Sequence, residues 1–425
     1  MDTKKTIQKS CPLCVLGALS GEPLMRTVWT FHSAGSLVFG RGAVEQLGEI
    51  TLRLPARRVF VVTDATLEKA GVVDRTVKPL RDVGANVEVF NGGRAEPSLK
   101  LVAECTGRAR AFGPDTVFGL GGGSNMDVAK MTAVLLCHGG EARDYLGDDR
   151  IPGPITPLIC VPTTAGTGSE VSGAAAFTDT DAAVKVGCLS NYLRPRVAVV
   201  DPLLTVSCPP KVTADSGIDA LTHAIEAFTA VDNVAFPLPP VERSVYQGRH
   251  PMGDLCAPEA IRLCGRHLRR AVTNGDDLDA REGMALAATL AGLAFSNVGV
   301  ALVHALEYPV GGATNCSHGE GNGLLLPHVM RFNAPVRQRE FARVAGLLGE
   351  DVTGLTDVDA ADRAIAAVER LLIDIGIPRR LRDLGVKVEQ LPDFAEKAAA
   401  IKRILRVNPR PVTAADCEGI YRAAL

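Results

Sequence analysis

The sequence is poor in aromatic residues and carries almost no net charge. Phe, Trp and Tyr make up 4% of the 425 residues, and the formal net charge at pH 7 is −2. A chain this close to neutral lacks the electrostatic attraction to nucleic-acid phosphates or to an anionic membrane surface that a strongly basic protein has. We therefore expect neither a nucleic acid nor a membrane as a partner.

Cysteine forms no recognisable disulfide or metal-binding pattern in this sequence. The 11 cysteines are odd in number and lie at long, irregular spacings, which is typical of reduced thiols in a cytoplasmic protein. The one C-x-x-C pair, Cys11 and Cys14, has no second pair that would complete a zinc ribbon. We expect a cytoplasmic location, and the pair gives little reason to expect a metal or redox site.

Two apolar stretches are too weak to indicate targeting or a membrane span. The N-terminus has lysines followed by a short apolar run, but the globular pattern begins only near Trp29, so we expect residues 1–28 to be a disordered extension. Residues 283–303 are uncharged and long enough to cross a bilayer. Because this stretch contains Ser296 and Asn297 and stands alone, we expect it to be a buried core helix.

What the sequence does have is glycine and short apolar runs. It contains 43 glycines and 46% hydrophobic residues, and its length favours two domains over a single core. Helical patterns such as 99–112 alternate with apolar runs typical of buried strands, at 57–64, 87–90, 116–123, 157–164 and 196–201. This alternation predicts a Rossmann-like α/β domain, with a parallel sheet covered by helices on both faces.

The strand pattern stops near residue 205. From Ala214 to the C-terminus the segments are long, rich in Ala and Leu, and helical in period. We therefore expect a dinucleotide-binding α/β domain at 29–204, followed by an all-α metal-binding and substrate domain at 205–425. One stretch rich in Pro and charge, 231–254, interrupts the helices, and a loop of that length is usually functional or mobile.

Two glycine-rich loops each follow a predicted strand. In "GLGGGSNMDVAK" (119–130), the three glycines let the backbone approach a diphosphate, and Ser124 with the first N–H groups of the next helix can donate hydrogen bonds to it. The pattern is not the generic G-x-G-x-x-G. A second loop, "PTTAGTGSE" (162–170), offers hydroxyl and backbone donors. Either loop alone is also consistent with a simple capped connection, but two at the carboxyl ends of strands favour one ligand crevice.

An acidic residue, Asp64, ends the first predicted strand. An acid at this place commonly accepts hydrogen bonds from the ribose hydroxyls of NAD and repels the 2′-phosphate of NADP. A helix N-cap before "ATLEKA" is an equally good interpretation of the position. The sequence leaves both roles open.

A carboxylate and an imidazole share one face of an otherwise apolar helical segment. In "DALTHAIEAF" (219–228), Asp219 and His223 are four residues apart, a spacing that puts both side chains on the same side of a helix. The pair is consistent with a satisfied polar contact or with half of a metal site.

Two further histidines lie in near-uncharged segments of the same part of the chain. His304 is expected to end the helix at 283–303, and Pro309 with the glycines after it is expected to break that helix before the chain returns to His318. A single histidine in an apolar segment is more often a core residue than a ligand. Three of them with Asp219 form a set suited to Fe²⁺ or Zn²⁺, with an open position for a substrate oxygen.

Taken together, these motifs resemble the iron-containing (group III) alcohol dehydrogenases. The resemblance covers about residues 29–425 and rests on "GGGSNMDVAK", "PTTAGTGSE", "DSGIDALTHAIEAF" and the His304-to-His318 separation. It implies NAD as cofactor and Asp219, His223, His304 and His318 as ligands of Fe²⁺ or Zn²⁺. The cofactor-binding residues that it implies are Asp64 at the adenosine ribose, Lys185 at the nicotinamide ribose, and Gly122, Gly123, Ser124, Asp127, Thr163, Thr164 and Thr167 between them.

The sequence departs from the family at one position. Many members have a further histidine four residues after the first helix-end ligand, where it is thought to help move the substrate proton, and this sequence has Tyr308 there. A phenol with an ordinary pKa of about 10 is a poor relay at neutral pH unless its surroundings lower that pKa. Tyr308 is therefore a candidate proton relay whose role depends on its environment.

The same tyrosine and the segment 245–272 resemble one branch of the family, the hydroxyacid-oxoacid transhydrogenases. The resemblance implies that members of this branch pass a hydride from a hydroxy acid such as 4-hydroxybutyrate to 2-oxoglutarate through retained NAD. Arg243 and Arg249 are candidates for pairing with a substrate carboxylate. Taken singly, each arginine is more commonly a solvated surface charge.

The resemblance implies a metal-dependent, NAD-linked alcohol dehydrogenase that interconverts a primary alcohol or hydroxy acid with its aldehyde or oxo acid. One alternative is the transhydrogenase reaction. A dehydroquinate-synthase-like lyase shares the broad fold, but the basic phosphate-binding residues expected around its metal are not evident. A non-catalytic NAD-binding or scaffold protein is disfavoured by the complete ligand set. The expected partner is a small-molecule substrate, and homo-oligomers are common in the family.

Overall fold

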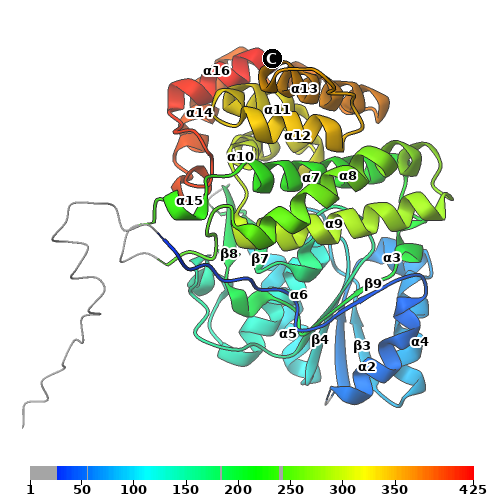
Figure 1. Cartoon of the computed structure of the whole chain (residues 1–425). Coiled ribbons are helices and arrows are strands. Elements are labelled where there is room, and N and C mark those ends of the chain that lie inside the picture. Colours follow the sequence, from blue (N-terminus) through cyan, green and yellow to red (C-terminus); the bar gives the residue numbers. More distant parts are fainter. Residues whose placement is uncertain (1–25, 55, 182–183, 239–242) are drawn as a thin grey trace, which may run out of the picture.

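The computed structural model describes residues 26–54, 56–181, 184–238 and 243–425. The predicted N-terminal extension up to residue 25, together with Cys11 and Cys14, lies outside the described residues. The cysteines within them are free. Sheets form the lower layer of the molecule in Figure 1, and helices of the second half of the chain are stacked above them.

A six-stranded parallel sheet is the centre of the first half of the chain. Its strands are, in spatial order, β1 (Leu37–Phe39), β9 (Val197–Val200), β6 (Leu158–Pro162), β4 (Thr116–Gly121), β2 (Arg58–Val62) and β3 (Asn86–Phe90). The five strands expected from the apolar runs are confirmed. β1 was not predicted, because a three-residue, largely exposed edge strand has too little hydrophobic pattern to be recognised.

Both faces of this sheet are covered, as expected for parallel strands. Alternate residues of β2 point to opposite sides: Phe60 and Val62 belong to one apolar cluster, and Val59 and Val61 to another. The helices that complete these clusters are α2 (Leu47–Arg53), α3 (Ala65–Lys69), α4 (Val72–Asp82), α5 (Leu99–Phe112) and α6 (Gly123–His138). The helix expected at 99–112 is therefore present with those bounds.

A small three-stranded sheet, not predicted from the sequence, connects the large sheet to the helical half. It consists of β5 (Gly147–Asp148), β8 (Val184–Leu189) and β7 (Ala174–Asp179), with β7 and β8 antiparallel. Its strands are only partly buried and rich in Ala and Gly, so their composition resembled a loop. In Figure 1 β7 and β8 rise from the sheet layer toward α10.

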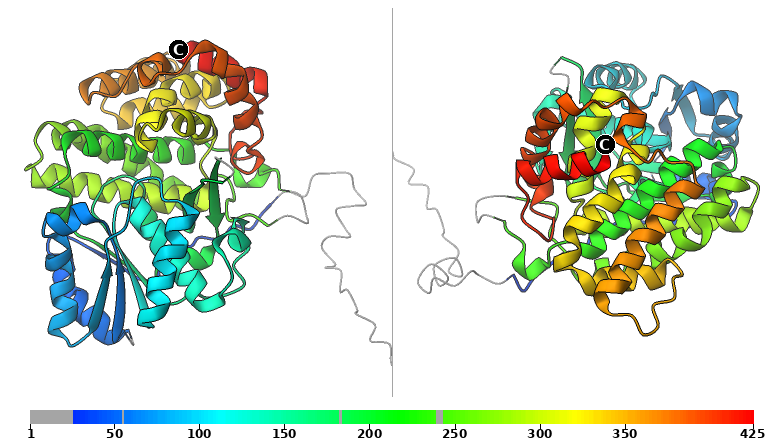
Figure 2. Two further views of the ribbon diagram at one scale, coloured as in Figure 1. Left: turned by 180° about the vertical axis from the view of Figure 1, so that it is seen from behind. Right: turned by 90° about the horizontal axis from the view of Figure 1, so that it is seen from above.

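The second half of the chain is helical and buries the largest apolar cluster of the protein. Figure 2 shows its helices from behind and from above, on one side of the sheet layer. They are α7 (Pro210–Thr229), α8 (Pro251–Thr273), α9 (Leu278–Val298), α10 (Leu302–Thr314), α11 (His318–Asn333), α12 (Gln338–Leu347), α13 (Asp357–Asp374), α14 (Leu391–Ala399), α15 (Lys402–Leu405) and α16 (Ala414–Ala424).

The helix expected at 283–303 is wrong in its C-terminal bound. α9 ends at Val298 because Gly299 adopts φ +122°, a conformation that residues with a side chain rarely take. His304 therefore lies in the first turn of α10 and not at the end of α9, and Pro309 lies inside α10 without ending it.

Among the described residues, no single helix is long and apolar enough to cross a membrane. The pair α9 and α10 passes that test only when taken together, and the two helices meet at an angle of 104°.

Candidate metal and dinucleotide site

The central helix α7 supplies a carboxylate and an imidazole, as its sequence predicted. Asp219 and His223 are both buried, and Nδ1 of His223 is 3.7 Å from Oδ2 of Asp219. The imidazole of His223 is stacked between the rings of Phe295 (4.2 Å between centroids) and His304 (4.7 Å). Packing against Phe295 and His304 thus fixes the plane of the His223 ring.

Glu226, one turn further along α7, orients the next imidazole. Its Oε2 accepts from Nδ1 of His304 at 2.6 Å and from the backbone N–H of Ala301 at 2.9 Å, while its Oε1 accepts from the N–H of Val303 at 2.7 Å. α10 has no capping side chain of its own, so Glu226 satisfies the free N–H groups of its first turn. With Nδ1 bound in this way, Nε2 of His304 faces Asp219 at 3.9 Å.

His318 is oriented by a second carboxylate in the same manner. It begins α11, where the Ser317 hydroxyl caps the helix. Gly319 brings this turn against α7, because a Cβ there would lie 1.9 Å from the Asp215 carbonyl oxygen. Nδ1 of His318 contacts Oε2 of Glu307 at 2.6 Å, and its Nε2 lies 4.0 Å from Oδ1 of Asp219.

The donor atoms of Asp219, His223 and His304 converge on one point, and Nε2 of His318 lies beside them, 4.0 Å from Oδ1 of Asp219. Asp219, His223 and His304 each offer a ligand atom, and these atoms lie within 4.8 Å of one another. Nδ1 of His223 is buried without a hydrogen-bond partner, which is costly for a polar atom unless a ligand engages it. Three imidazoles and the Asp219 carboxylate are a donor set that fits Fe²⁺ or Zn²⁺. Two of the imidazoles, those of His304 and His318, are also held at Nδ1 by the carboxylates of Glu226 and Glu307, as is usual for metal-binding histidines.

The imidazoles differ strongly in their affinity for a proton. Burial lowers the pKa of His223 to about 4, although Asp219 acts against this shift. Burial also opposes the imidazolium form of His318, but Glu307 and Asp219 outweigh it and raise its pKa to about 9. Two carboxylates near one imidazole thus make this end of the cluster strongly attractive to positive charge.

Asn322 is a member of the cluster that the sequence analysis missed. Its Nδ2 contacts Oδ1 of Asp219 at 2.9 Å, Nε2 of His318 at 3.1 Å and Nε2 of His304 at 3.3 Å. Asn322 lies four residues after His318 on α11, and that spacing places both side chains on one face. The same i, i+4 rule that selected Asp219 and His223 was sufficient to find it.

The two glycine-rich loops meet where β4 and β6 end. Gly122 caps α6 at the end of β4, and a Cβ on Gly123 would lie 2.8 Å from Cγ2 of Thr167 in the second loop. The second loop also touches the helical half, since Gly168 adopts φ +58° and a Cβ there would lie 2.5 Å from Cα of Gly292 on α9. Glycine is therefore needed at these places for the two loops to pack against each other and against α9, and the N-terminus of α6, which offers free N–H groups, lies at their meeting point.

Several predicted cofactor-binding residues already have structural partners. Asp64 caps α3 through Oδ1, which accepts from the N–H groups of Thr66 and Leu67, and its Oδ2 accepts from Asn125 at 2.8 Å. Asp64 is thus an N-cap, which is one of its two predicted roles. The oxygens of its carboxylate still retain lone pairs for a ribose hydroxyl, the other predicted partner. Asp127 accepts from Ser169 Oγ at 2.8 Å and from a backbone N–H of β7 at 2.9 Å.

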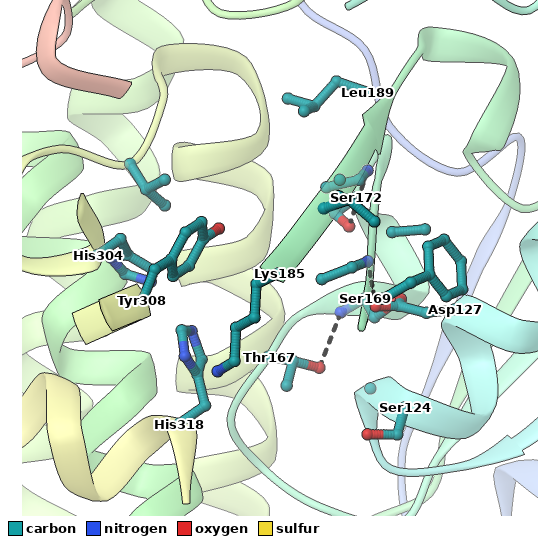
Figure 3. Close-up of a pocket in the computed structure, with 18 of the residues that line it drawn as sticks. Ser124, Asp127, Thr167, Ser169, Ser172, Lys185, Leu189, His304, Tyr308 and His318 are labelled. Atoms are coloured by element: carbon teal, nitrogen blue, oxygen red, sulfur yellow. Dashed lines mark hydrogen bonds between the residues drawn. The ribbon is translucent and has the colours of Figure 1, made fainter. Parts of the chain in front are cut away.

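One cavity joins the glycine-rich loops to the metal-ligand cluster (Figure 3). Among the predicted cofactor residues, those that line it are Gly123, Ser124, Asp127, Thr167 and Lys185, and the ligand candidates that line it are Asp219, His223, His304 and His318. Asp64, Gly122, Thr163 and Thr164 are not part of its lining. In Figure 3 the end of the Lys185 side chain lies between His318 and Thr167.

Lys185 is held in this place by two carboxylates. Its Nζ is 3.3 Å from Oε2 of Glu96 and 3.4 Å from Oε1 of Glu307, the same side chain that contacts His318. Burial opposes the charged ammonium, but the two carboxylates dominate and raise its pKa above the ordinary value. Lys185 is therefore a permanent cation at the nicotinamide end expected for the cofactor.

Tyr308 also lines the cavity, one turn after His304 on α10. Burial raises the pKa of its phenol above 10, and the nearby positive charge of Arg403 only partly offsets this effect. The phenol thus stays protonated at neutral pH and is suited to donating a hydrogen bond. Tyr246 and Arg403 are among the lining residues that were not anticipated.

The arginines suggested by the sequence lie elsewhere. Arg249 forms ion pairs of 2.7 Å with both Asp254 and Glu340, and Arg243 is an exposed side chain 3.5 Å from Asp149. Neither is part of the cavity lining. The expectation that they face a substrate carboxylate is therefore not met, because both are used by carboxylates of the protein.

Comparison with known proteins bears on the whole chain. The family model described as iron-containing alcohol dehydrogenase matches residues 34–202, and the model of the C-terminal part of the Fe-containing alcohol dehydrogenase family matches residues 241–425. A long-chain-alcohol dehydrogenase of Geobacillus thermodenitrificans is 41% identical over 91% of this chain and 94% of its own length. The mitochondrial hydroxyacid-oxoacid transhydrogenase of Rattus norvegicus is 31% identical over 94% of this chain and 90% of its own.

Solved structures agree with this assignment. A crystal structure of 1,3-propanediol oxidoreductase has a TM-score of 0.88 at 38% identity, and covers 94% of this chain and 100% of its own. A sulfoacetaldehyde reductase from Bifidobacterium kashiwanohense in complex with NAD⁺ has a TM-score of 0.79 at 30% identity, and covers 94% and 99%. The predicted fold class and the expectation of NAD and iron as the cofactors of the family are thereby confirmed. The chain belongs to the iron-containing alcohol dehydrogenase family and is an oxidoreductase of that family.

Proposed function

We propose that this protein is a metal-dependent, NAD-linked alcohol dehydrogenase that interconverts a primary alcohol or hydroxy acid with its aldehyde or oxo acid. The observation that carries the proposal is the convergence of Asp219, His223, His304 and His318 at one end of the cavity whose other end is formed by the glycine-rich loops. We further propose that residues 29–204 hold the dinucleotide and residues 205–425 hold the metal and the substrate.

The residues of the site have distinct roles in this proposal. Asp219, His223, His304 and His318 would hold Fe²⁺ or Zn²⁺, which when bound supplies Lewis acidity at the alcohol oxygen, while NAD⁺ supplies a hydride acceptor. Glu226 and Glu307 fix the Nδ1 atoms of two imidazoles, so that the Nε2 atoms point inward. Asn322 restrains the carboxylate of Asp219 through its amide.

The cofactor residues are assigned by position. Gly122, Gly123, Ser124, Thr163, Thr164 and Thr167 belong to the two loops that would hold the diphosphate. Asp64 lies at the end of β2, where a carboxylate accepts from the adenosine ribose and disfavours a 2′-phosphate. Asp127 supports this region indirectly, through Ser169 and β7. Lys185 would lie beside the nicotinamide ribose.

Tyr308 would act as a hydrogen-bond donor to the substrate and not as a base. Its phenol is held in the protonated form by burial, so it cannot accept the alcohol proton at neutral pH. The proton would therefore leave by way of the cofactor ribose or solvent. Replacing Tyr308 by Phe tests this role: the KM of the alcohol should rise while the affinity for metal and the pH profile of kcat stay unchanged.

The test of the proposed function uses purified protein loaded with Fe²⁺ or with Zn²⁺. We expect NADH to form from a primary alcohol or 4-hydroxybutyrate with added NAD⁺. The variant His304→Ala should stay folded but should lose both the metal and the activity. Full activity of metal-free protein would refute the proposal.

The transhydrogenase reaction is a second candidate, supported by the 31% identical rat enzyme of that name and by Tyr308. It is tested in the same preparation with 4-hydroxybutyrate and 2-oxoglutarate. Formation of 2-hydroxyglutarate without added NAD⁺ would establish transhydrogenation with a retained cofactor. NADH formation only with added NAD⁺ would establish the ordinary dehydrogenase.

A further inference from the structure

The lining of the cavity includes a cation that the protein itself barely uses. Its lining contains one lysine and one arginine, Lys185 and Arg403. Lys185 is engaged by the carboxylates of Glu96 and Glu307. The guanidinium of Arg403 has Oδ1 of Asp148 at 3.9 Å, and in the described part of the chain no hydrogen bond from it is formed.

Arg403 reaches the cavity because of two local features. It lies on the short helix α15, which packs against α10, the helix that carries His304 and Tyr308. Its guanidinium passes over β8 at Gly187, where a Cβ would lie 2.9 Å from Nη2. Any larger residue at position 187 would displace the arginine, so the backbone of β8 is shaped to admit it.

The surroundings of Arg403 suit the anionic end of a small ligand. Its side chain is 25% exposed, and a cation withdrawn this far from water gains from a charged hydrogen-bond acceptor. The buried phenols of Tyr246 and Tyr308 lie in its field, and among the charges acting on each of them that of Arg403 is the largest. Both residues line the same cavity.

The two ends of a substrate would therefore meet different chemistry. In the proposed function, the metal held by Asp219 and the imidazoles would take the hydroxyl or carbonyl oxygen of the substrate. The planar guanidinium of Arg403 matches the two oxygens of a carboxylate. Apolar side chains such as Val300 and Leu189 line the cavity as well, and they suit a short methylene chain.

We propose that Arg403 binds a terminal carboxylate of the substrate, so that the enzyme selects hydroxy acids and their aldehyde acids over neutral alcohols of the same length. This inference rests on the proposed alcohol dehydrogenase function and names its substrate class. Arg403 is a specificity-determining residue in this proposal. The alcohol is oxidised at the other end of the substrate, away from its carboxylate.

Steady-state kinetics test the proposal through a ratio. The values of kcat/KM are measured with metal-loaded enzyme and NAD⁺ for 4-hydroxybutyrate and for its neutral counterpart 1,4-butanediol. The ratio of the two should favour the acid in the native protein. In Arg403→Gln it should fall on the order of 10- to 100-fold, the usual contribution of a charge-assisted hydrogen bond. Lys402→Gln removes the same charge from an exposed neighbour on α15, and the ratio should not change.

A binding measurement separates this inference from the proposed function. Butyrate and its neutral counterpart butyramide are titrated calorimetrically into metal-loaded native protein and into Arg403→Gln. Butyrate should bind the native protein more tightly, and the substitution should remove that preference without lowering the Tm. An unchanged preference in Arg403→Gln would overturn the role of Arg403. Absence of turnover for every alcohol would instead refute the dehydrogenase function, while the butyrate titration would still report on Arg403.

Discussion

Replacing Glu307 by Gln isolates what a buried carboxylate does for the metal site. Oε2 of Glu307 lies 2.6 Å from Nδ1 of His318, and Oε1 lies 3.4 Å from Nζ of Lys185. A carboxylate behind a ligand imidazole raises its basicity, and loss of such a partner typically lowers metal affinity 10- to 100-fold. Gln keeps an oxygen for the Nδ1–H group but loses the charge and the acceptor for Lys185, which retains Glu96. Because the contact with His318 survives, we expect the lower end, about 10-fold or roughly 1.4 kcal/mol.

The assay is competition for Zn²⁺ or Fe²⁺ between the protein and a chromophoric chelator, with Tm measured in parallel. Glu226→Gln is the matched control, since Glu226 holds His304 in the same way but also binds two backbone N–H groups of α10. A glutamine there leaves one of these donors facing an amide NH₂ group, which costs about 1–3 kcal/mol of stability. We therefore expect Tm to fall further in Glu226→Gln than in Glu307→Gln, where Lys185 keeps its contact with Glu96. A metal affinity of Glu307→Gln within twofold of the native value would refute the reasoning.

Three further substitutions test other parts of the fold. Gly123→Ala should lower the free energy of unfolding by about 1–3 kcal/mol, because its Cβ would lie 2.8 Å from a threonine methyl, whereas Gly122→Ala has 3.6 Å and should cost less in urea titrations. Lys130→Met should cost about 3–5 kcal/mol by the same measurement, since the buried Nζ of Lys130 lies within hydrogen-bond distance of four oxygens that would lose this contact; full stability would contradict this. Asp64→Ser retains an N-cap but removes the carboxylate, so the ratio of kcat/KM for NADP⁺ to that for NAD⁺ should rise while Tm stays nearly constant.

The parts of the site that could be predicted from the sequence are those that local spacing determines. Asp219 and His223 are one helical turn apart, and the glycine-rich loops follow strands whose apolar runs are continuous. The fold class followed from the same runs. Arg403 was not predictable, because the packing of α15 on α10 and the absence of a side chain at Gly187 bring it into the cavity.

Helix ends were predicted less well than helix interiors. The break between α9 and α10 depends on the φ of Gly299, while the residues on either side of it are uncharged and mostly apolar. The carboxylate partners were missed for a related reason. Glu226 and Glu307 lie among apolar residues, and only the tertiary structure shows that each faces an imidazole far away or on another helix.

The charges around the imidazoles favour a bound cation at this cluster. Asp219, Glu226 and Glu307 are all buried, and within the described chain the lysine or arginine ion-paired with any of them is Lys185. Buried carboxylates without compensation are costly, and one ammonium offsets only one of the three. The raised pKa of His318, about 9 despite burial, shows the same excess of negative charge. A divalent cation held by the proposed ligands would offset the remaining negative charge, so the carboxylates that are costly without a metal are the ones that would strengthen its binding.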